Sequence, residues 1–398
     1  MQRISKLAKV RFKGFDIILD RKQLGEITTS FSGGTPKSGN KTYYEGNIPF
    51  IRSGEIKSKQ TELSISDDAL KDSSAKMVEK GDILYALYGA TSGEVAISQI
   101  NGAINQAILA IKPNSGYSSE FIMNYLKKEK DNILEKYLQG GQGNLSAAIV
   151  RSIELYLPSQ DEQSAIGFLF RTLDDLLSSY KDNLANYQSL KATMLSKMFP
   201  KAGQTIPEIR LDGFEGEWKE KTLGSLGSVA MNKRIFKNET SENGDIPFYK
   251  IGTFGETADA FISKEKFKEY KEKYPYPEIG DILISASGSI GRTVVYNGED
   301  AYYQDSNIVW LKHDQQLDNL YLKQYYGIIK WSGIEGTTIK RLYNKNILET
   351  NIFLPPSVAE QQAIGAYFSN LDNLIAAHQE KISQLETLKK KLLQDMFI

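Results

Sequence analysis

Residues 33–42 come closest to a phosphate-binding loop among the glycine-rich segments of the chain, with the sequence Gly-Gly-Thr-Pro-Lys-Ser-Gly-Asn-Lys-Thr. A nucleotide-binding loop of this type needs lysine directly after its last glycine, so that the amine reaches the β- and γ-phosphates. Here Asn40 separates Gly39 from Lys41, and Pro36 interrupts the loop. We therefore do not expect ATP binding, and a polar, basic loop suits contact with nucleic-acid phosphates instead.

The residue patterns of DNA-modifying enzymes are weak in this sequence. An adenine methyltransferase carries Asn/Asp-Pro-Pro-aromatic, whereas residues 354–357 read Leu-Pro-Pro-Ser. Residues 31–34 (Phe-Ser-Gly-Gly) imitate an adenosylmethionine loop poorly, and Glu55-Ile56-Lys57 is a nuclease-like triplet that often arises by chance. With no cysteine and only His313 and His378, the chain has neither thiolate zinc ligands nor a histidine cluster. We predict no catalytic and no metal-binding residues.

Candidate nucleic-acid contacts are the basic, amide and tyrosine side chains on glycine-rich turns. Arginine and lysine suit guanine O6 and N7 or phosphate, whereas asparagine and glutamine suit the edge of adenine. Any one of these residues, taken alone, is better explained as an ordinary solvated surface residue than as a DNA contact. They occur, however, on equivalent turns of the two similar halves of the chain, and this favours a shared role. The candidates are Lys37, Asn40, Lys41, Tyr43, Arg52, Lys57, Tyr88, Gln142 and Asn144, then Asn232, Lys233, Arg234, Lys250, Arg292, Lys340 and Arg341.

These turns belong to a tandem duplication. Residues 48–50 (Ile-Pro-Phe) recur at 246–248, and residues 81–84 (Gly-Asp-Ile-Leu) recur at 280–283. The offset stays between 197 and 199 along the chain. The residues between these landmarks differ freely, which is typical of one scaffold that carries two different surfaces.

Each copy ends in a long apolar heptad repeat. It starts Glu-Gln-x-Ala-Ile-Gly at residues 162–167 and again at 360–365. Such a repeat over about five heptads predicts a coiled-coil seam, and a helix of about 38 residues would be roughly 57 Å long, too long for the core of one compact domain. The predicted seam residues are Ile166, Leu173, Leu176, Tyr180, Tyr187, Ile364, Leu371, Leu374, His378 and Leu385.

The globular halves have short apolar runs bounded by Gly, Asn and Pro, which predict strands, and apolar periodicity at 119–137 and 317–331, which predicts helices. The expected fold class is α+β, with two globular domains in tandem, each followed by a long helix. We place the first domain at 1–157, the first helix at 158–199, a linker at 200–222, the second domain at 223–356 and the second helix at 357–398.

The composition is that of an ordinary soluble protein, with 40% hydrophobic and 25% charged residues in a chain of 398. There is no apolar run of the ~18 residues that a membrane span needs, and residues 1–15 are basic without a hydrophobic stretch. We expect a cytoplasmic protein. A net charge of +0 neither supports nor excludes a nucleic-acid partner.

Taken together, these features resemble the specificity subunit of type I restriction-modification systems over essentially the whole chain. The resemblance is carried by the two Leu-Pro…Glu-Gln-x-Ala-Ile-Gly helix starts, the two Gly-Asp-Ile-Leu strands, and Arg-Leu-Asp-Gly-Phe at 210–214 followed by Trp218 and Leu223-Gly224. The first copy departs from this pattern, because Ile17 or Ile18 falls where a tryptophan equivalent to Trp218 would be.

The resemblance implies that each globular half is a target-recognition domain that reads one half of a bipartite site in double-stranded DNA. It implies an antiparallel coiled coil, in which Leu173, Leu176 and Tyr180 would face Leu371, Leu374 and His378 in a register that the sequence leaves open. It also implies a non-catalytic subunit that recruits two modification subunits and, through them, restriction subunits. S-adenosylmethionine, ATP and Mg2+ would then bind to the partner subunits.

Two alternatives remain at this point: a fused or stand-alone DNA methyltransferase or nuclease, and a coiled-coil scaffold unrelated to DNA. The first lacks active-site residues, and the second leaves the two different domain surfaces without a purpose.

Overall fold

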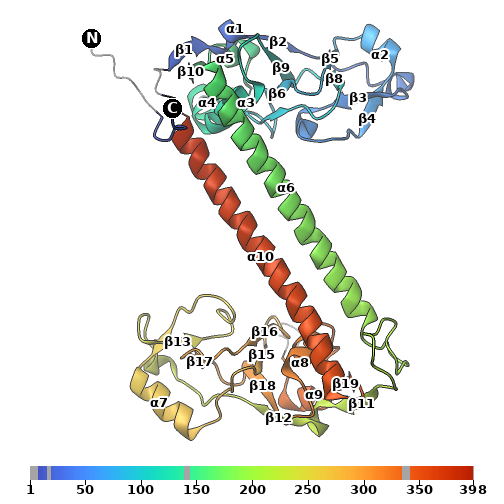
Figure 1. The fold of residues 1–398 in the computed structure, drawn as a ribbon, viewed down its shortest axis with the longest axis vertical. Helices are drawn as coiled ribbons and strands as arrows, with labels where there is room; N and C mark the ends of the chain where they lie inside the picture. The colour runs from blue at the N-terminus through green and yellow to red at the C-terminus, as the bar shows by residue number, and fades with distance from the viewer. Residues whose placement is uncertain (1–7, 16–18, 139–143, 334–340, 398) are drawn as a thin grey trace. The chain divides into compact units, whose positions relative to one another are not determined.

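The computed structural model describes residues 8–15, 19–138, 144–333 and 341–397. The chain forms two compact units (Figure 1). The first contains Met1–Lys181 together with Glu380–Ile398, and the second contains Asp182–Gln379. The units are not two consecutive segments of the chain, because the last part of each long helix belongs to the unit of the other repeat.

In its described residues, the first unit contains two four-stranded sheets and a two-stranded ribbon. The main sheet, antiparallel throughout, has the order β2-β9-β6-β7, and the second sheet has the order β4-β3-β8-β5 with β3 parallel to β8. The strand bounds are Thr28–Ser32 (β2), Ile108–Pro113 (β9), Ile83–Ala86 (β6), Val95–Ile97 (β7), Leu63–Ile65 (β4), Ile48–Ile51 (β3), Gly102–Ile104 (β8) and Lys76–Val78 (β5), with Asp20–Gln23 (β1) paired to Glu154–Leu157 (β10).

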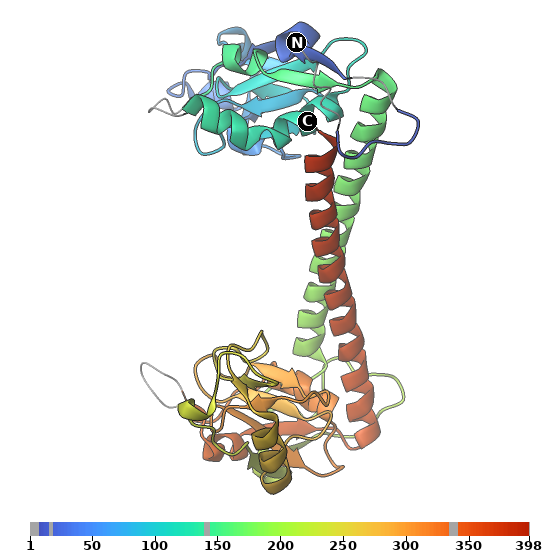
Figure 2. The same cartoon turned by 90° about the vertical axis from the view of Figure 1, so that its left-hand side faces the viewer.

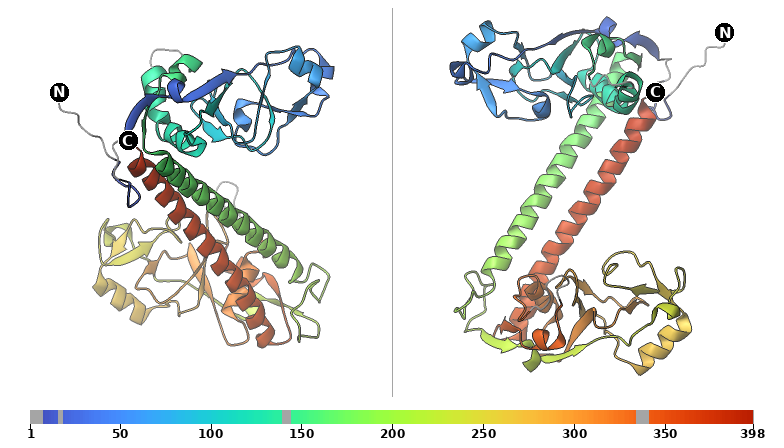
Figure 3. Two further views of the ribbon diagram at one scale, coloured as in Figure 1. Left: turned by 45° about the horizontal axis from the view of Figure 1, so that its top comes forward. Right: turned by 180° about the vertical axis from the view of Figure 1, so that it is seen from behind.

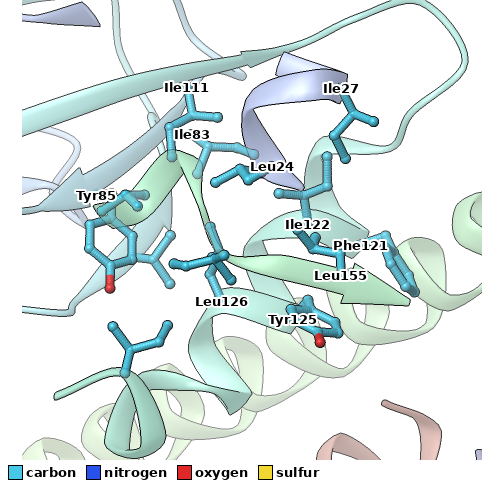
Figure 4. Close-up of a cluster of buried hydrophobic side chains, with 14 of the residues drawn as sticks. Leu24, Ile27, Ile83, Tyr85, Ile111, Phe121, Ile122, Tyr125, Leu126 and Leu155 are labelled. Carbon is cyan, nitrogen blue, oxygen red and sulfur yellow. The ribbon is translucent and has the colours of Figure 1, made fainter. Parts of the chain in front are cut away.

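The main sheet is buried on both faces. Ile83 and Tyr85 of β6 pack against helix α3 (Ser119–Lys128) (Figure 4). Leu84 and Ala86 pack against the second sheet. Successive side chains of a strand point to opposite faces, so a strand covered on both sides has an uninterrupted apolar sequence. This explains the run Ile-Leu-Tyr-Ala-Leu-Tyr at 83–88.

The second unit repeats this plan. Its main sheet has the order β12-β18-β15-β16, and its smaller sheet has the order β14-β13-β17 with β13 parallel to β17. Ile282 and Ile284 of β15 face the helices, and Leu283 faces the smaller sheet. The bounds are Gly227–Ala230 (β12), Ile308–His313 (β18), Ile282–Ser285 (β15), Thr293–Val295 (β16), Phe261–Ile262 (β14), Ile246–Tyr249 (β13) and Tyr302–Tyr303 (β17), with Lys219–Thr222 (β11) paired to Asn351–Leu354 (β19).

Short helices complete both units. Residues 119–137, expected as one helix, form α3 and a second helix α4 (Lys130–Leu138), which meet at Glu129. The corresponding helix of the second unit is shorter than expected, since α8 covers Asn319–Tyr326 and its C-cap is Gly327. The others are α1 (Leu24–Ile27), α2 (Asp67–Lys71), α5 (Ala147–Arg151), α7 (Lys264–Lys273) and α9 (Asn344–Leu348).

The two long helices are α6 (Gln160–Lys197) and α10 (Val358–Met396). In both units a stretch of α6 lies beside an antiparallel stretch of α10 (Figure 2). Ion pairs join Asp174 to Lys389 and Lys181 to Glu386 in the first unit, and Lys191 to Asp372 in the second. The expected α+β fold with two tandem domains and an antiparallel helix pair is confirmed.

The sequence left the register of this pair open, and the ion pairs define it within each unit. In the second unit Tyr187 lies against His378, with ring centroids 5.1 Å apart. Leu176 and Leu374 are 39% and 40% exposed, whereas Leu177, Leu371 and Leu385 are buried. Ile166 and Ile364 are buried in the globular cores, together with the neighbouring part of their own helix. The N-terminal part of each helix thus faces the C-terminal part of the other.

The end of each long helix completes the core of the other repeat's domain. Phe199, just after α6, packs in the second unit against Trp218, Tyr321, Tyr325 and Phe368. At the equivalent place in the first unit, Phe397 packs against Phe121, Tyr125 and Phe170 where α10 ends beside α3 and α4 (Figure 3).

The Glu-Gln-x-Ala-Ile-Gly sequence attaches each long helix to its domain. The side chains of Glu162 and Glu360 are 1% exposed and form bidentate ion pairs with Arg11 and Arg210, respectively. In the second copy, Gln361 accepts a hydrogen bond from the Asp318 amide and donates one to the Gln316 carbonyl. A Cβ at Gly365 would lie 2.7 Å from Leu320, so only glycine allows this approach. The most recognisable sequence of the chain is therefore structural.

Ile17 and the neighbouring residues that replace a Trp218 equivalent lie outside the described residues. No helix in the described ranges combines the length and apolar character that crossing a membrane requires.

Candidate nucleic-acid interface

Four loops of the first unit meet at one edge of the main sheet. We call this meeting place the loop junction; it consists of residues 33–42, 87–94, 104–107 and 144–146. Gly34 donates its amide to the Ile104 carbonyl, and the Thr35 hydroxyl donates to Oε1 of Gln106. The amide of Leu87 donates to Ala107, the amide of Leu145 donates to Leu87, and Tyr88 forms a β-bridge with Asn144.

The second unit has the same loop junction, formed by residues 232–240, 286–292, 303–307 and 341–345. Its amide of Ala286 donates to Asn307, the amide of Leu342 donates to Ala286, and Ser287 forms a bridge with Arg341. Where the first unit has Thr35 bonded to Gln106, the second has Nε of Arg234 bonded to Oδ2 of Asp305 at 2.8 Å. Both members of this pair are shifted by 199 residues, so the junctions are equivalent while their side chains differ.

The glycines of residues 33–42 serve close packing. A Cβ on Gly33 would lie 1.9 Å from the Ile104 carbonyl oxygen, and one on Gly34 would lie 2.5 Å from Cβ of Ser74. These distances forbid any side chain, so glycine lets the loop pass directly over β8. Packing over β8 therefore explains the glycines of this loop, whose sequence is similar to that of a nucleotide-binding loop.

Most first-half candidates lie at the loop junction. Lys37, Asn40 and Lys41 belong to its first loop, and Lys37 and Lys41 are exposed. Tyr43 directly follows this loop and is half-buried, with its hydroxyl bonded to Asp72. Tyr88 and Asn144 form the bridge itself. Gln142 lies outside the described residues.

Arg52 and Lys57 do not belong to the junction loops, and both are neutralised by carboxylates. Arg52 is hydrogen-bonded to Glu55 and Glu62, which raise the pKa of its guanidinium. Lys57 donates to Glu94. The same contacts occupy both charged residues of Glu55-Ile56-Lys57, and the described residues contain no group of three side chains arranged to hold a metal ion.

In the second half, Arg234 and Arg341 lie at the junction, and Lys340 is outside the described residues. Asn232 was a wrong prediction, because its side chain is buried, 2% exposed, and donates to the Pro275 carbonyl. The remaining three, of which Lys233 and Arg292 also belong to junction loops, are held by local contacts. Lys233 lies over the ring of Tyr274, Lys250 pairs with Asp259, and Arg292 donates to the Phe254 carbonyl at 2.6 Å.

Several junction residues were not predicted from the sequence. Gln106 and Asp305 lie 71 residues after Thr35 and Arg234, the residues of the first loop to which they are bonded. Ser287 donates its hydroxyl to Oδ1 of Asn307 at 2.7 Å. Phe236 and Tyr343 are 60% and 48% exposed on junction loops. An alignment of the two repeats at an offset of 199 would have drawn attention to Gln106 and Asp305.

The Glu94 carboxylate is expected to make acid unfolding of the first unit steeper. Hydrogen bonds from Lys130 and Lys57 lower the pKa of Glu94 from 4.5 to about 2. A depressed pKa stabilises the fold above the unfolded value, and this stability is lost as pH falls from about 4.5 through about 2. Glu94→Gln should remove that dependence, with an effect below about 1 kcal/mol because the group is partly solvated. Circular dichroism across this pH range, with Glu62→Gln as an exposed control, measures it; equal slopes for both variants would contradict the expectation.

A family model described as the type I restriction modification DNA specificity domain matches residues 19–186 and again 215–387. The putative type I restriction enzyme specificity subunit S.HindORF215P of Haemophilus influenzae is 56% identical over 153 residues, which are 38% of this chain and 40% of that protein. The type I restriction enzyme MjaIX specificity subunit of Methanocaldococcus jannaschii is 25% identical over 94% of this chain and 91% of its own length.

Solved structures show the same fold. The crystal structure of a type I restriction-modification system S subunit from M. genitalium superposes with a TM-score of 0.67 and 16% identity, covering 99% of both chains. Because the family model matches twice and spans most of the chain, the chain belongs to the type I restriction-modification DNA specificity family.

Proposed function

We propose that this protein is the sequence-reading subunit of a type I restriction-modification system and that each unit reads one half of a bipartite DNA site. The observation that carries the proposal is the repeated loop junction, in which equivalent backbone hydrogen bonds support different side chains. A shared backbone presents loops to the duplex in a common way, while different side chains read different bases.

The long helices have two proposed roles in this function. They are continuous over 38 and 39 residues, so their length is suited to fixing the number of unread base pairs. They also carry exposed leucines in pairs. The ion-pair register places Leu176 next to Leu388 in the first unit and Leu190 next to Leu374 in the second, and all four are 38–45% exposed.

Two equivalent leucine pairs suit two copies of one partner, and we propose that these copies are modification subunits. Exposed apolar side chains at equivalent positions mark protein-binding surfaces. A chain from a structure on complex assembly of a type I restriction-modification system shares the fold, with a TM-score of 0.50. Methyl transfer and restriction would then belong to the modification and restriction subunits, which would also bind S-adenosylmethionine, ATP and Mg2+.

Exchanging residues 223–355 for the same segment of another member of the family tests this function. The methylated sequence of the assembled complex, read by single-molecule sequencing, is expected to change in one half-site only, because the other junction is untouched. The purified chain alone should transfer no methyl group to DNA. A change in both half-sites, or methylation by the isolated chain, would contradict the proposal.

A further inference from the structure

The Arg234–Asp305 pair replaces the Thr35–Gln106 pair at the loop junction. Each pair joins the loop that follows the first strand of the main sheet to the turn that precedes β9 or β18. The pairs occupy equivalent positions and differ in chemistry, since one is ionic and the other neutral.

Asp305 is a fixed acceptor. Its side chain is 16% exposed, and its carbonyl accepts the amide of Asn307 at 2.6 Å. Asn307 in turn accepts the Ser287 hydroxyl, which ties this turn to the one between β15 and β16. Because these bonds hold the turn that carries Asp305, its carboxylate is positioned to set the direction of the guanidinium bonded to it.

Arg234 keeps most of its donors available. A guanidinium carries five N–H groups in a rigid fork. Asp305 engages Nε, and the side chain of Arg234 is 59% exposed. Within the described part of the chain, its Nη1 and Nη2 groups make no hydrogen bond, so a complete two-nitrogen edge points away from the pair.

We propose that Asp305 positions Arg234 so that its Nη edge reads guanine O6 and N7 in the half-site of the second unit. The inference rests on the proposed function and adds a base-reading residue and its positioning residue to it. Two parallel N–H donors match the two acceptors that guanine presents in the major groove.

A contact with a base fits the pair better than a contact with phosphate. Phosphate contacts carry no sequence information. Two units that bind the same DNA backbone would therefore be expected to have the same phosphate-contacting residues. Position 35 is threonine where position 234 is arginine, and Gln106 offers an amide where Asp305 is a carboxylate. An amide suits the adenine edge. The difference in side chains between the two units is therefore of the kind that changes which base is read.

The experiment uses the complete chain assembled with its modification subunits and a DNA library randomised across both half-sites. Arg234→Ala should lower discrimination at one guanine of the second half-site by about 10- to 100-fold, the loss expected for one bidentate contact. Asp305→Ala should lower it at the same position by a smaller factor, because arginine remains but is no longer directed. Lys273→Ala, in the exposed ion pair with Glu269, is the matched control and should change neither half-site.

A double replacement separates base reading from a merely structural role. Arg234→Thr combined with Asp305→Gln introduces the pair of the first unit, and it should change the base preferred at this position while the first half-site stays the same. Thermal unfolding followed by tryptophan fluorescence checks that each variant is folded, because all three tryptophans belong to the second unit.

Three results would overturn the inference. Arg234→Ala could leave discrimination unchanged. It could weaken binding to all sequences alike and reduce the slope of log affinity against log salt by about one, which is the behaviour of a phosphate contact. If Asp305→Ala left discrimination unchanged, the positioning role would be wrong. The exchange of residues 223–355 decides the proposed function separately, since it can succeed while these variants fail.

Discussion

Phe397→Ala is expected to destabilise the first unit by about 3–5 kcal/mol, the usual cost of removing a buried phenylalanine. Its ring is 4% exposed, and its centroid lies 5.1 Å from that of Phe121 and 5.7 Å from that of Phe170. The cavity would form where α10 closes the core of the first unit. Faster hydrogen exchange in α3 and β6 would report it, whereas tryptophan fluorescence, which reports on the second unit, should shift less.

Two variants make this test specific. Phe199→Ala removes the equivalent ring and should produce the opposite pattern, with a large shift in tryptophan fluorescence. Lys390→Ala changes an exposed residue of the same helix as Phe397 and should leave both signals near those of the unaltered protein. Equal loss of protection in both units after Phe397→Ala would show that the core contact is not local to the first unit.

Arg210→Met is expected to cost the second unit about 3–5 kcal/mol, because it leaves Glu360 buried without its partner. The Arg210 side chain is 15% exposed and that of Glu360 is 1% exposed, with Nε and Nη2 of Arg210 each 2.8 Å from a carboxylate oxygen. Arg210 also donates to the carbonyls of Gly216 and Glu215, which adds to the loss. Urea unfolding followed by tryptophan fluorescence measures the change.

Replacing both partners distinguishes a buried charge from a lost contact. Arg210→Met with Glu360→Leu should be more stable than Arg210→Met alone, since a well-packed apolar pair often substitutes for a buried ion pair. Lys201→Met breaks the exposed pair with Glu208 and should cost no more than about 1 kcal/mol. A double variant as unstable as the single one would mean that the bonds to Gly216 and Glu215 dominate.

The duplication made much of the fold predictable. Matching landmarks near a constant offset separated the repeats, and uninterrupted apolar runs predicted strands such as β6 and β18. The register of α6 against α10 could not be predicted in the same way. A heptad repeat defines a stripe on a helix but not its partner residue. Ile166 and Ile364, the first residues of the two predicted seams, pack in the globular cores instead.

The candidate interface was harder to predict, because burial and pairing come from distant segments. Asn232 and Arg234 are neighbours in a polar stretch, yet only the first meets the Pro275 carbonyl and becomes buried. Arg52 and Lys57 look like free cations in sequence, but Glu62 and Glu94 reach them through the fold. Conversely, Gln106 and Asp305 have ordinary sequence surroundings and gain significance from the loops that they meet.

The packing of Phe397 in the first unit has a consequence for synthesis on the ribosome. Met396 and Phe397 belong to the same buried core as Leu24 and Ile83, so this core is complete only once residue 397 has been made. During translation the first unit must wait with apolar surface exposed, whereas Phe199 is available to the second unit as soon as that unit is complete. Partly folded chains of this kind are prone to aggregate. We therefore expect the second unit to mature first and the first unit to depend on chaperones for longer, although it is made earlier.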